Sequence, residues 1–353
     1  MAGRTRARWT LLGLLTLTAA LYAPSLAFGY VYQDEAWIPW LTARPGVTLP
    51  GRGLALASHV AVGLRPDVDH LVNVALHLTN GGLVAGIGSA LAGPAVGVVA
   101  AGVFLLHPLT STTVAYLSAR TDLLMTFGIL LAVWLSLRRV TWTRIGLLAG
   151  ACVLAAMSKE PGIVALGLVA WTGWRRRQEG RLLALTVCAC VLGAGFVLGG
   201  GLTVVQTWWT LPAPMGGPSL PWGAWLSLQH AQLWHLVALV VQSPLWRKGF
   251  SIEHDALSLS PWAQLVAGLC SVQMVALAIW GRWPRLTWAV GWVILSLAPR
   301  FVFRTSEFVS EPHLYLPMAG ISVGLGCLAV WLWQSVGVTH VLSDVPIPSH
   351  ARA

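Results

Sequence analysis

The sequence is short of charge, and above all of acidic residues. Only 12 of its 353 residues are Asp or Glu, and charged residues make up 10% of the chain, whereas about a quarter is usual for a soluble domain. Apolar residues make up 56%, and the mean hydropathy is +0.71. This composition excludes an ordinary soluble domain and predicts a polytopic membrane protein.

Cysteine is also scarce, and several repeating patterns are absent. The five cysteines all fall in apolar segments, where thiols act as packing residues, so neither a disulfide framework nor a thiolate metal site is indicated. Apolar and polar residues do not alternate at period two, which argues against an outer-membrane barrel. No internal repeat or heptad pattern stands out. The remaining fold class is an all-α bundle of membrane-spanning helices.

The apolar stretches predict ten spans, because about 20 apolar residues are needed to cross a 30 Å hydrocarbon core as a helix. These spans form one membrane domain over residues 1–334, and residues 335–353 are predicted to be a disordered tail. The predicted spans are residues 9–28, 68–90, 94–107, 122–137, 144–158, 161–174, 182–205, 261–281, 286–300 and 314–334.

Basic residues lie in four short clusters between these spans, so the net charge of +10 is interpreted as an orientation signal and not as a nucleic-acid surface. With the amino terminus in the cytoplasm, every cluster falls inside, as the positive-inside rule requires. The tail is then cytoplasmic, and the expected location is a plasma or inner membrane. The clusters are Arg4, Arg6 and Arg8; Arg138, Arg139 and Arg144; Arg175, Arg176, Arg177 and Arg181; and Arg282 and Arg285.

Three segments allow a second interpretation. The basic start and the first apolar run also resemble a signal peptide, but the run is long and lacks a clean small-residue cleavage site, which favours a retained anchor. The outer loop 29–67 contains an apolar stretch over residues 53–64 that could lie on the membrane surface. The outer segment 206–260 contains another at residues 228–245, which is an interfacial or re-entrant helix or else an eleventh span.

Acidic residues gather on the outer side of this topology, where ten of the twelve fall. The pair Asp34-Glu35 follows the first span closely, and a carboxylate so near lipid indicates a functional site. Asp67, Asp69 and Asp255 are interpreted as ordinary loop residues.

Two further acids stand at the ends of predicted spans. Asp122 opens one span, where a carboxylate also favours the helix dipole, and Lys159-Glu160 closes another, where both charges could simply mark the membrane boundary. An outer face that holds both signs predicts an enzyme that binds a lipid phosphate with cations while a carboxylate takes a proton.

The motifs, taken in order, resemble those of the membrane-embedded GT-C glycosyltransferases, closest to the protein O-mannosyltransferase branch whose animal members carry TPR repeats. The resemblance extends from the first span to about residue 324. It rests on four motifs. The first runs from His70 to His77, in which Asn73 and His77 lie four residues apart on one helix face. The others are His107-Pro108 followed by Arg120-Thr121-Asp122-Leu123-Leu124, then Ser158-Lys159-Glu160-Pro161-Gly162, and Glu311-Pro312-His313-Leu314-Tyr315-Leu316-Pro317.

The resemblance implies transfer of one sugar, mannose in the closest branch, from a polyprenyl-phosphate donor to an acceptor hydroxyl on the non-cytoplasmic face, with inversion. It implies that Asp34 is the general base, that Glu35 orients it or replaces it, and that Asp122 is a further catalytic acid. Arg120 and Lys159 are implied as ligands of the donor phosphate. The implied cavity-lining residues are His107, Glu160, Glu311, His313 and Tyr315.

The sequence departs from this family in two ways. Pro312 stands where the animal relatives usually have Arg, so Arg300 or Arg304 must supply that charge if it is needed. The TPR repeats are missing, so the acceptor is a protein or a glycan. No metal is predicted, although the carboxylates could hold a divalent cation. A multi-pass transporter and a catalytically inactive GT-C relative remain the alternatives.

Overall fold

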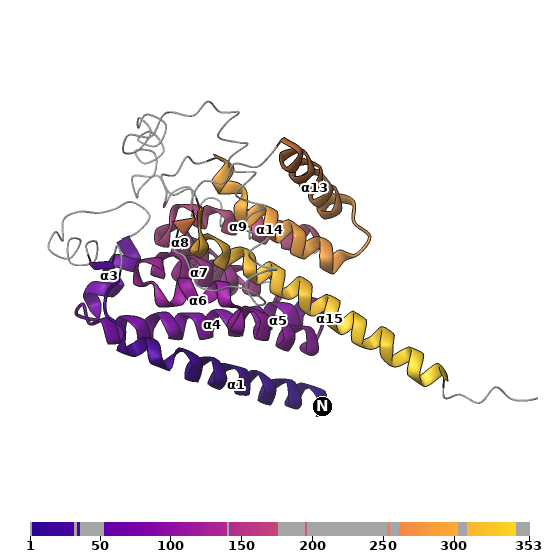
Figure 1. The fold of residues 1–353 in the computed structure, drawn as a ribbon, viewed down its shortest axis with the longest axis horizontal. Coiled ribbons are helices and arrows are strands. Elements are labelled where there is room, and N and C mark those ends of the chain that lie inside the picture. Colours follow the sequence, from indigo (N-terminus) through magenta and orange to yellow (C-terminus); the bar gives the residue numbers. More distant parts are fainter. Residues whose placement is uncertain are drawn as a thin grey trace, which may run out of the picture.

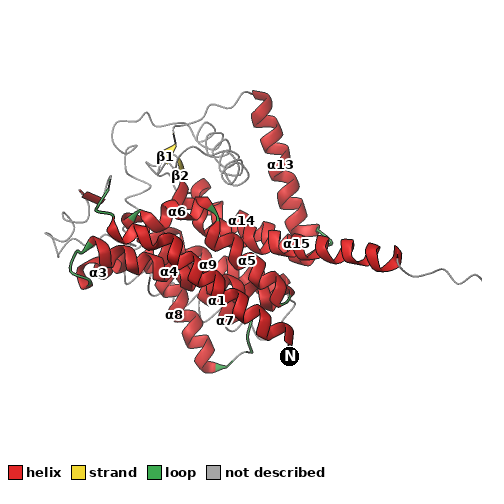
Figure 2. Ribbon diagram, turned by 60° about the horizontal axis from the view of Figure 1, so that its bottom comes forward, coloured by secondary structure: helices red, strands yellow, loops and turns green. Residues whose placement is uncertain are grey.

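The computed structural model describes residues 2–31, 34–35, 53–139, 141–175, 195, 253–254, 261–302 and 309–343. The described part is helical except for one pair of two-residue strands (Figure 2). Those strands, β1 (Glu253–His254) and β2 (Val309–Ser310), pair antiparallel. The predicted all-α fold class is therefore confirmed in this coarse form.

The helices coincide with nine of the ten predicted spans, and the span at 182–205 lies outside the described residues except for residue 195. The first half contains α1 (Ala2–Tyr22), η1 (Ala23–Ala27), α3 (Gly53–Ala61), α4 (Pro66–Ala92), α5 (Pro94–Leu106), α6 (Pro108–Ala115), η2 (Leu117–Ala119) and α7 (Arg120–Ser136). The second half contains α8 (Trp142–Ser158), η3 (Glu160–Ile163), α9 (Val164–Arg175), α13 (Pro261–Trp280), α14 (Pro284–Val302), η5 (Glu311–Leu314) and α15 (Tyr315–Ser343).

Proline sets many of these helix boundaries. A proline in the first helical position loses no hydrogen bond, because the first amides of a helix have no partner, and its fixed φ suits the helix. Pro317 is tolerated within the first turn of α15 for the same reason. The described helices that begin at a proline are α4, α5, α6, α13 and α14.

The protein is a membrane protein with several candidate spans. Four described helical segments are long and apolar enough to cross a bilayer, and α5 with α6, bent by 58° at His107, makes a fifth if the pair is one span. The four segments are Thr5–Ala27, Pro66–Ala92, Leu117–Ser136 and Glu311–Val336. The predicted total of ten or eleven spans stays a prediction.

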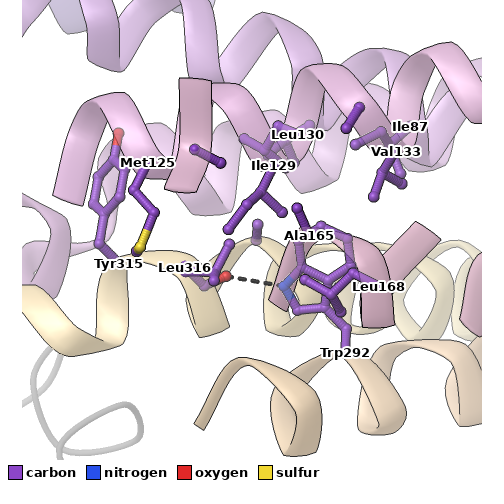
Figure 3. Packing of buried hydrophobic residues seen from close by; sticks show 14 of the residues in the cluster. Ile87, Met125, Ile129, Leu130, Val133, Ala165, Leu168, Trp292, Tyr315 and Leu316 are labelled. Carbon is purple, nitrogen blue, oxygen red and sulfur yellow. Dashed lines mark hydrogen bonds between the residues drawn. The ribbon is translucent and has the colours of Figure 1, made fainter. Parts of the chain in front are cut away.

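The helices form a layered bundle. Helix α1 packs on α4 and α5, which contact α7 and α15, and α14 covers α15 and α9 with α13 outermost (Figure 1). The apolar core lies between α7, α9, α14 and α15, where Ile129 and Leu168 are buried beside Trp292 (Figure 3). The indole of Trp292 donates a hydrogen bond to the Leu316 carbonyl at 3.0 Å, which ties α14 to α15.

The bundle has two ends. Helix α1 begins at one of them (Figure 1). Several exposed tryptophans stand close in sequence to the predicted basic clusters, among them Trp9 next to Arg8 and Trp142 near Arg144, and tryptophan is common at membrane interfaces. Helix α3 and the first turns of α4 lie at the opposite end (Figure 1). The exposed tryptophans of the described residues are Trp9, Trp142, Trp174, Trp280, Trp283, Trp331 and Trp333.

The helices at two predicted segments, the interfacial stretch and the tail, have ends that differ from the prediction. The interfacial stretch 53–64 contains the helix α3, which ends at Ala61. Helix α15 continues through residues 335–343 of the predicted tail, because the first proline after Pro317 is Pro346 and nothing earlier interrupts the helix. The rest of that tail and the stretch 228–245 lie outside the described residues.

Candidate functional site

Asp34 follows α1, and its carboxylate is fully buried against the start of α7. Its Oδ2 accepts a hydrogen bond from the Leu117 amide at 3.0 Å, and its Oδ1 accepts bonds from the Ser118 amide at 2.8 Å and from the Ser118 hydroxyl. Leu117 begins the turn η2 that leads into α7, and the first amides of a helix lack carbonyl partners within it. Asp34 therefore caps this helical start with a negative charge.

The pKa and the hydrogen bonds of the Asp34 carboxylate suit a group that accepts a proton. Burial raises the pKa of Asp34 above its ordinary value, although the hydrogen bonds from Ser118 and Leu117 act to lower it. Oδ1 accepts two bonds and Oδ2 accepts one, so Oδ2 keeps acceptor capacity. A buried carboxylate with a raised pKa and a free lone pair can act as a general base. Its neighbour Glu35 is exposed.

The capped amides are available because the preceding helix breaks. Helix α6 ends at Ala115, and Tyr116 is extended, with φ −87° and ψ 114°. In a continuous helix the Ser118 amide would bond to the Val114 carbonyl; that carbonyl instead accepts from Asn73 Nδ2 at 3.1 Å. Asn73 on α4 and Asp34 together satisfy the groups that the break releases.

Arg120, the first residue of α7, is held entirely within the protein. Its Nη2 donates to the carboxylate and to the backbone carbonyl of Asp69, each at 2.7 Å. Its Nε donates to Asn73 Oδ1 at 2.8 Å, and its Nη1 donates to Ser58 Oγ at 3.2 Å. Neither Arg120 nor Asp69 has exposed side-chain surface. The guanidinium predicted to bind phosphate is thus surrounded by protein groups.

Asp69 is a site residue that the interpretation of the sequence missed. It is fully buried, and besides Arg120 it binds His59 Nδ1 at 2.9 Å and the Tyr30 hydroxyl at 3.3 Å. The description of Asp69 as an ordinary loop residue is therefore wrong. Asp67 does match that description, because it is exposed and pairs with Arg65. Asp255 lies outside the described residues.

A helical spacing in the sequence is the signal that could have found Asp69. Asp69 precedes Asn73 by four residues, and Asn73 precedes His77 by four, so the three share one face of α4. All three are buried, and Asn80 extends the same polar stripe deeper into the bundle. Each polar residue on this stripe binds another part of the protein, as expected for polar groups inside a membrane domain.

Asp122 and Lys159 form a buried ion pair. The Lys159 Nζ donates to both carboxylate oxygens of Asp122, at 3.0 and 2.8 Å. Lys159 retains 10% side-chain exposure and Asp122 retains 4%, whereas Arg120 retains none. Of these two predicted phosphate ligands, Lys159 is the more accessible.

A tight turn places Lys159. Helix α8 ends at Ser158, Lys159 is extended, and the Gly162 amide donates to the Lys159 carbonyl at 2.8 Å. A side chain at position 162 would overlap the backbone carbonyl of Ala155. The Ser-Lys-Glu-Pro-Gly motif therefore combines a proline, which opens the next helical turn, with a glycine that permits close approach.

His77 and Tyr315 join α4 to α15 inside the bundle. The Tyr315 hydroxyl lies 2.8 Å from His77 Nδ1, and the Asn80 amide donates to the same hydroxyl at 3.3 Å. His77 Nε2 lies 3.2 Å from the Leu105 carbonyl. That carbonyl lacks a helical partner, because the Leu109 amide bonds to His107 Nδ1. The proton of His77 is therefore assigned to Nε2, and Tyr315 donates to Nδ1.

The remaining predicted cavity residues lie at the start of α6 and in η5, two elements that contact each other. His107 is half-buried and caps α6. Glu311 is fully buried and accepts a bond from the Thr112 hydroxyl at 2.6 Å, and His313 is half-buried beside it in η5.

Three predicted site features lie outside what the structure describes. They are residue 304 and the side chains of Glu160 and Arg300.

The predicted residues come together as two adjacent groups. Asp34 contacts the turn that begins three residues before Arg120. Asp122 follows Arg120 by two residues in the first turn of α7. Lys159 joins the second group through Asp122. Among the described residues, no group of three His, Cys, Asp or Glu side chains could hold a metal ion. The predicted metal-free mechanism stays a prediction.

Comparison with protein-family models, curated proteins and solved structures finds no match to this chain.

Proposed function

We propose that the chain is a GT-C-type membrane glycosyltransferase that uses a polyprenyl-phosphate sugar as donor. The observation that carries the proposal is the Asp34 carboxylate, which is buried, has a raised pKa and is aligned by Leu117 and Ser118. A second charged pair, Asp122 with Lys159, lies on the same α7 helix. The resemblance of the motifs supplies the reaction class.

In this proposal the acceptor hydroxyl is made nucleophilic by Asp34. The hydroxyl oxygen attacks the anomeric carbon, its proton passes to the Asp34 carboxylate, and the bond from that carbon to the phosphate oxygen breaks. The electron pair of the broken bond leaves with the polyprenyl phosphate. Attack opposite the leaving group inverts the anomeric carbon, and a positioned base of this kind contributes about 100-fold to 10,000-fold to the rate.

The charge that grows on the phosphate requires a cation. Lys159 is the stronger candidate, because its ammonium retains some exposure and an ammonium has a third hydrogen after its two bonds to Asp122. Arg120 is enclosed by Asp69, Asn73 and Ser58 and is assigned a different role below. Arg300 and Arg304 remain the proposed additional phosphate ligands.

The placement of these groups agrees with an active site on the non-cytoplasmic face. Asp34 and Lys159 both bind the start of α7, which Arg120 joins to the first turn of α4. The first turns of α4 lie at the end of the bundle away from the start of α1 (Figure 1). The opposite end carries exposed tryptophans such as Trp9 and Trp142 near basic clusters, which the positive-inside rule assigns to the cytoplasm. The acceptor in the proposal is a hydroxyl of a protein or a glycan.

A transporter is the second candidate, because the buried polar stripe of α4 reaches Asn80 within a candidate span. A substrate pathway needs polar groups that can exchange partners with the cargo. On this stripe Asn73 binds the Val114 carbonyl, His77 binds Tyr315, and Asn80 binds the Leu123 carbonyl at 3.2 Å. These bonds to the protein favour a structural stripe and hence the enzyme.

The test is transfer from purified donor lipids. The protein in lipid nanodiscs is given polyprenyl-phosphate mannose, glucose and other sugars with serine peptides and glycans as acceptors, and the expected result is a glycosylated acceptor with inverted configuration. Lys159→Gln should lower kcat/KM roughly 10-fold to 100-fold through loss of a charge-assisted hydrogen bond. Arg65→Gln, which removes an exposed cation, should leave transfer unchanged. Substrate uptake into vesicles without any transfer would favour the transporter.

A further inference from the structure

Asp69 occupies a junction between four parts of the chain. It lies in the first turn of α4, and its Oδ1 binds both Arg120 at the start of α7 and His59 on α3. Its Oδ2 accepts from the hydroxyl of Tyr30, in the segment after α1. Burial and the negative charge of Asp69 raise the pKa of Tyr30 to about 12, so the tyrosine remains a hydrogen-bond donor. The carboxylate therefore holds three partners from outside its own helix.

The contact with Arg120 fixes the start of α7. Arg120 is one residue beyond the three-residue turn η2, and its guanidinium is bound on α4 by Asn73 and by both the side chain and the carbonyl of Asp69. Leu117 and Ser118 form the first part of η2. Because so short a turn has little freedom once its end is anchored, the Arg120 contacts set the direction of these two amides.

The contact between Asp69 and Tyr30 fixes the segment that carries Asp34. Tyr30 lies four residues before Asp34, and its bond to Asp69 ties this part of the chain to the first turn of α4. One carboxylate thus anchors both the segment that carries Asp34 and the turn that receives it.

We propose that Asp69 is a positioning residue that holds Asp34 on the Leu117 and Ser118 amides, and that Arg120 acts with it as a positioning residue and not as a phosphate ligand. The description of Asp34 as a base rests on the proposed function. The geometry that Asp69 maintains does not depend on it.

Hydrogen exchange at Leu117 and Ser118 tests the positioning directly. Asp69→Asn removes the negative charge and places an amide donor among the donors of Arg120 and His59, so it should release the start of α7. Exchange of the two amides, measured by mass spectrometry with residue resolution on the full chain in nanodiscs, should rise at least about tenfold, as it should in Asp34→Asn. The control Asp67→Asn, which changes an exposed acid of the same helical turn, should leave both amides protected.

Kinetics separate positioning from general damage to the fold. Asp69→Asn should lower kcat with little change in donor KM. It should also move the acid limb of the pH profile to lower pH, because an Asp34 released into solvent loses the burial that raises its pKa. A merely structural role of Asp69 would reduce the amount of active protein and leave the profile in place.

A second variant keeps the test decisive if Asp69→Asn does not fold. Tyr30→Phe removes only the hydroxyl that bonds Asp69, and it should raise exchange of the two amides by about threefold, since one hydrogen bond is lost. Unchanged exchange in Tyr30→Phe, or in folded Asp69→Asn, overturns the positioning role whatever the activity. Raised exchange in a protein that transfers no sugar would uphold the positioning role and refute the proposed function instead.

Discussion

Removing the Arg120 guanidinium should destabilise the fold strongly, because it breaks a buried ion pair. Arg120 and Asp69 are an ion pair at 2.7 Å without exposed side-chain surface. Arg120→Met leaves the Asp69 carboxylate buried without its cation, and breaking such a pair costs about 3 to 5 kcal/mol. The methionine also leaves the Asn73 and Ser58 oxygens without their Arg120 donor.

The measurement is a double-mutant cycle in nanodiscs. Unfolding of the wild type, Arg120→Met, Asp69→Asn and the double variant is followed by circular dichroism in increasing denaturant. Since the double variant buries no unpaired charge, its loss of stability should be smaller than the sum of the two single losses by about 1 to 3 kcal/mol.

The exposed pair Arg65 and Asp67 is the matched control for this cycle. Its Nη2 to Oδ2 distance is 2.6 Å, slightly shorter than the distance in the buried pair. The bond to Asp67 raises the pKa of Arg65, but both side chains are largely in solvent, and such pairs contribute little. The cycle for Arg65→Gln and Asp67→Asn should therefore show no measurable coupling. Additive losses in the buried pair, or equal coupling in the two pairs, would refute the reasoning that burial decides the strength.

Three further predictions concern the polar interior and the turns. Tyr315→Phe should cost about 1 to 3 kcal/mol of stability, because His77 Nδ1 loses its donor; an unchanged denaturation midpoint would contradict the assigned tautomer. Gly162→Ala should cost about 1 to 3 kcal/mol by overlap with the Ala155 carbonyl, whereas the open position Gly146 should accept Ala without loss. Activity should fall as the pH drops through the raised pKa of Asp34, and a wild-type acid limb at the value of an exposed aspartate would contradict its burial.

The helices were predictable because their signals are local. The length of an apolar stretch identifies a membrane span, because without water the backbone N–H and C=O groups must bond to each other, as they do in a helix. Pro66 and Pro284 stand at the first helical position, so they mark α4 and α14 almost to the residue. The end of α15 was less predictable: the sequence predicts a disordered tail from residue 335, whereas the helix continues to Ser343, before the proline at position 346.

The site was predictable only in part, because its contacts depend on packing between distant segments. The sequence marks Asp34 as a candidate site residue because burying a carboxylate near lipid costs free energy. Its partners Leu117 and Ser118 lie 83 and 84 positions further along the chain, so no local pattern predicts them. Asp69 resembled its exposed neighbour Asp67 in sequence. The difference is that the helical face of Asp69 turns toward Arg120. Local composition cannot distinguish these two acids, whereas the shared face with Asn73 could have.

The pairing of Lys159 with Asp122 is a similar case. Each residue marks the end of a predicted span, and the sequence supports a boundary role for both. Their ion pair arises because α7 packs against α8 in opposite directions, which brings the start of one helix beside the end of the other. The helix order therefore implied proximity, but not which side chains would meet.

The most direct test of the central claim is sugar transfer by Asp34→Asn beside the control Asp67→Asn, with both proteins folded in nanodiscs and supplied with the donor that the wild type uses. If Asp34 takes the acceptor proton, Asp34→Asn should lower kcat at least about 100-fold while donor binding persists. Asp67→Asn should match the wild type, since Asp67 is exposed and bound only to surface groups. Transfer by Asp34→Asn at the wild-type rate would contradict the account.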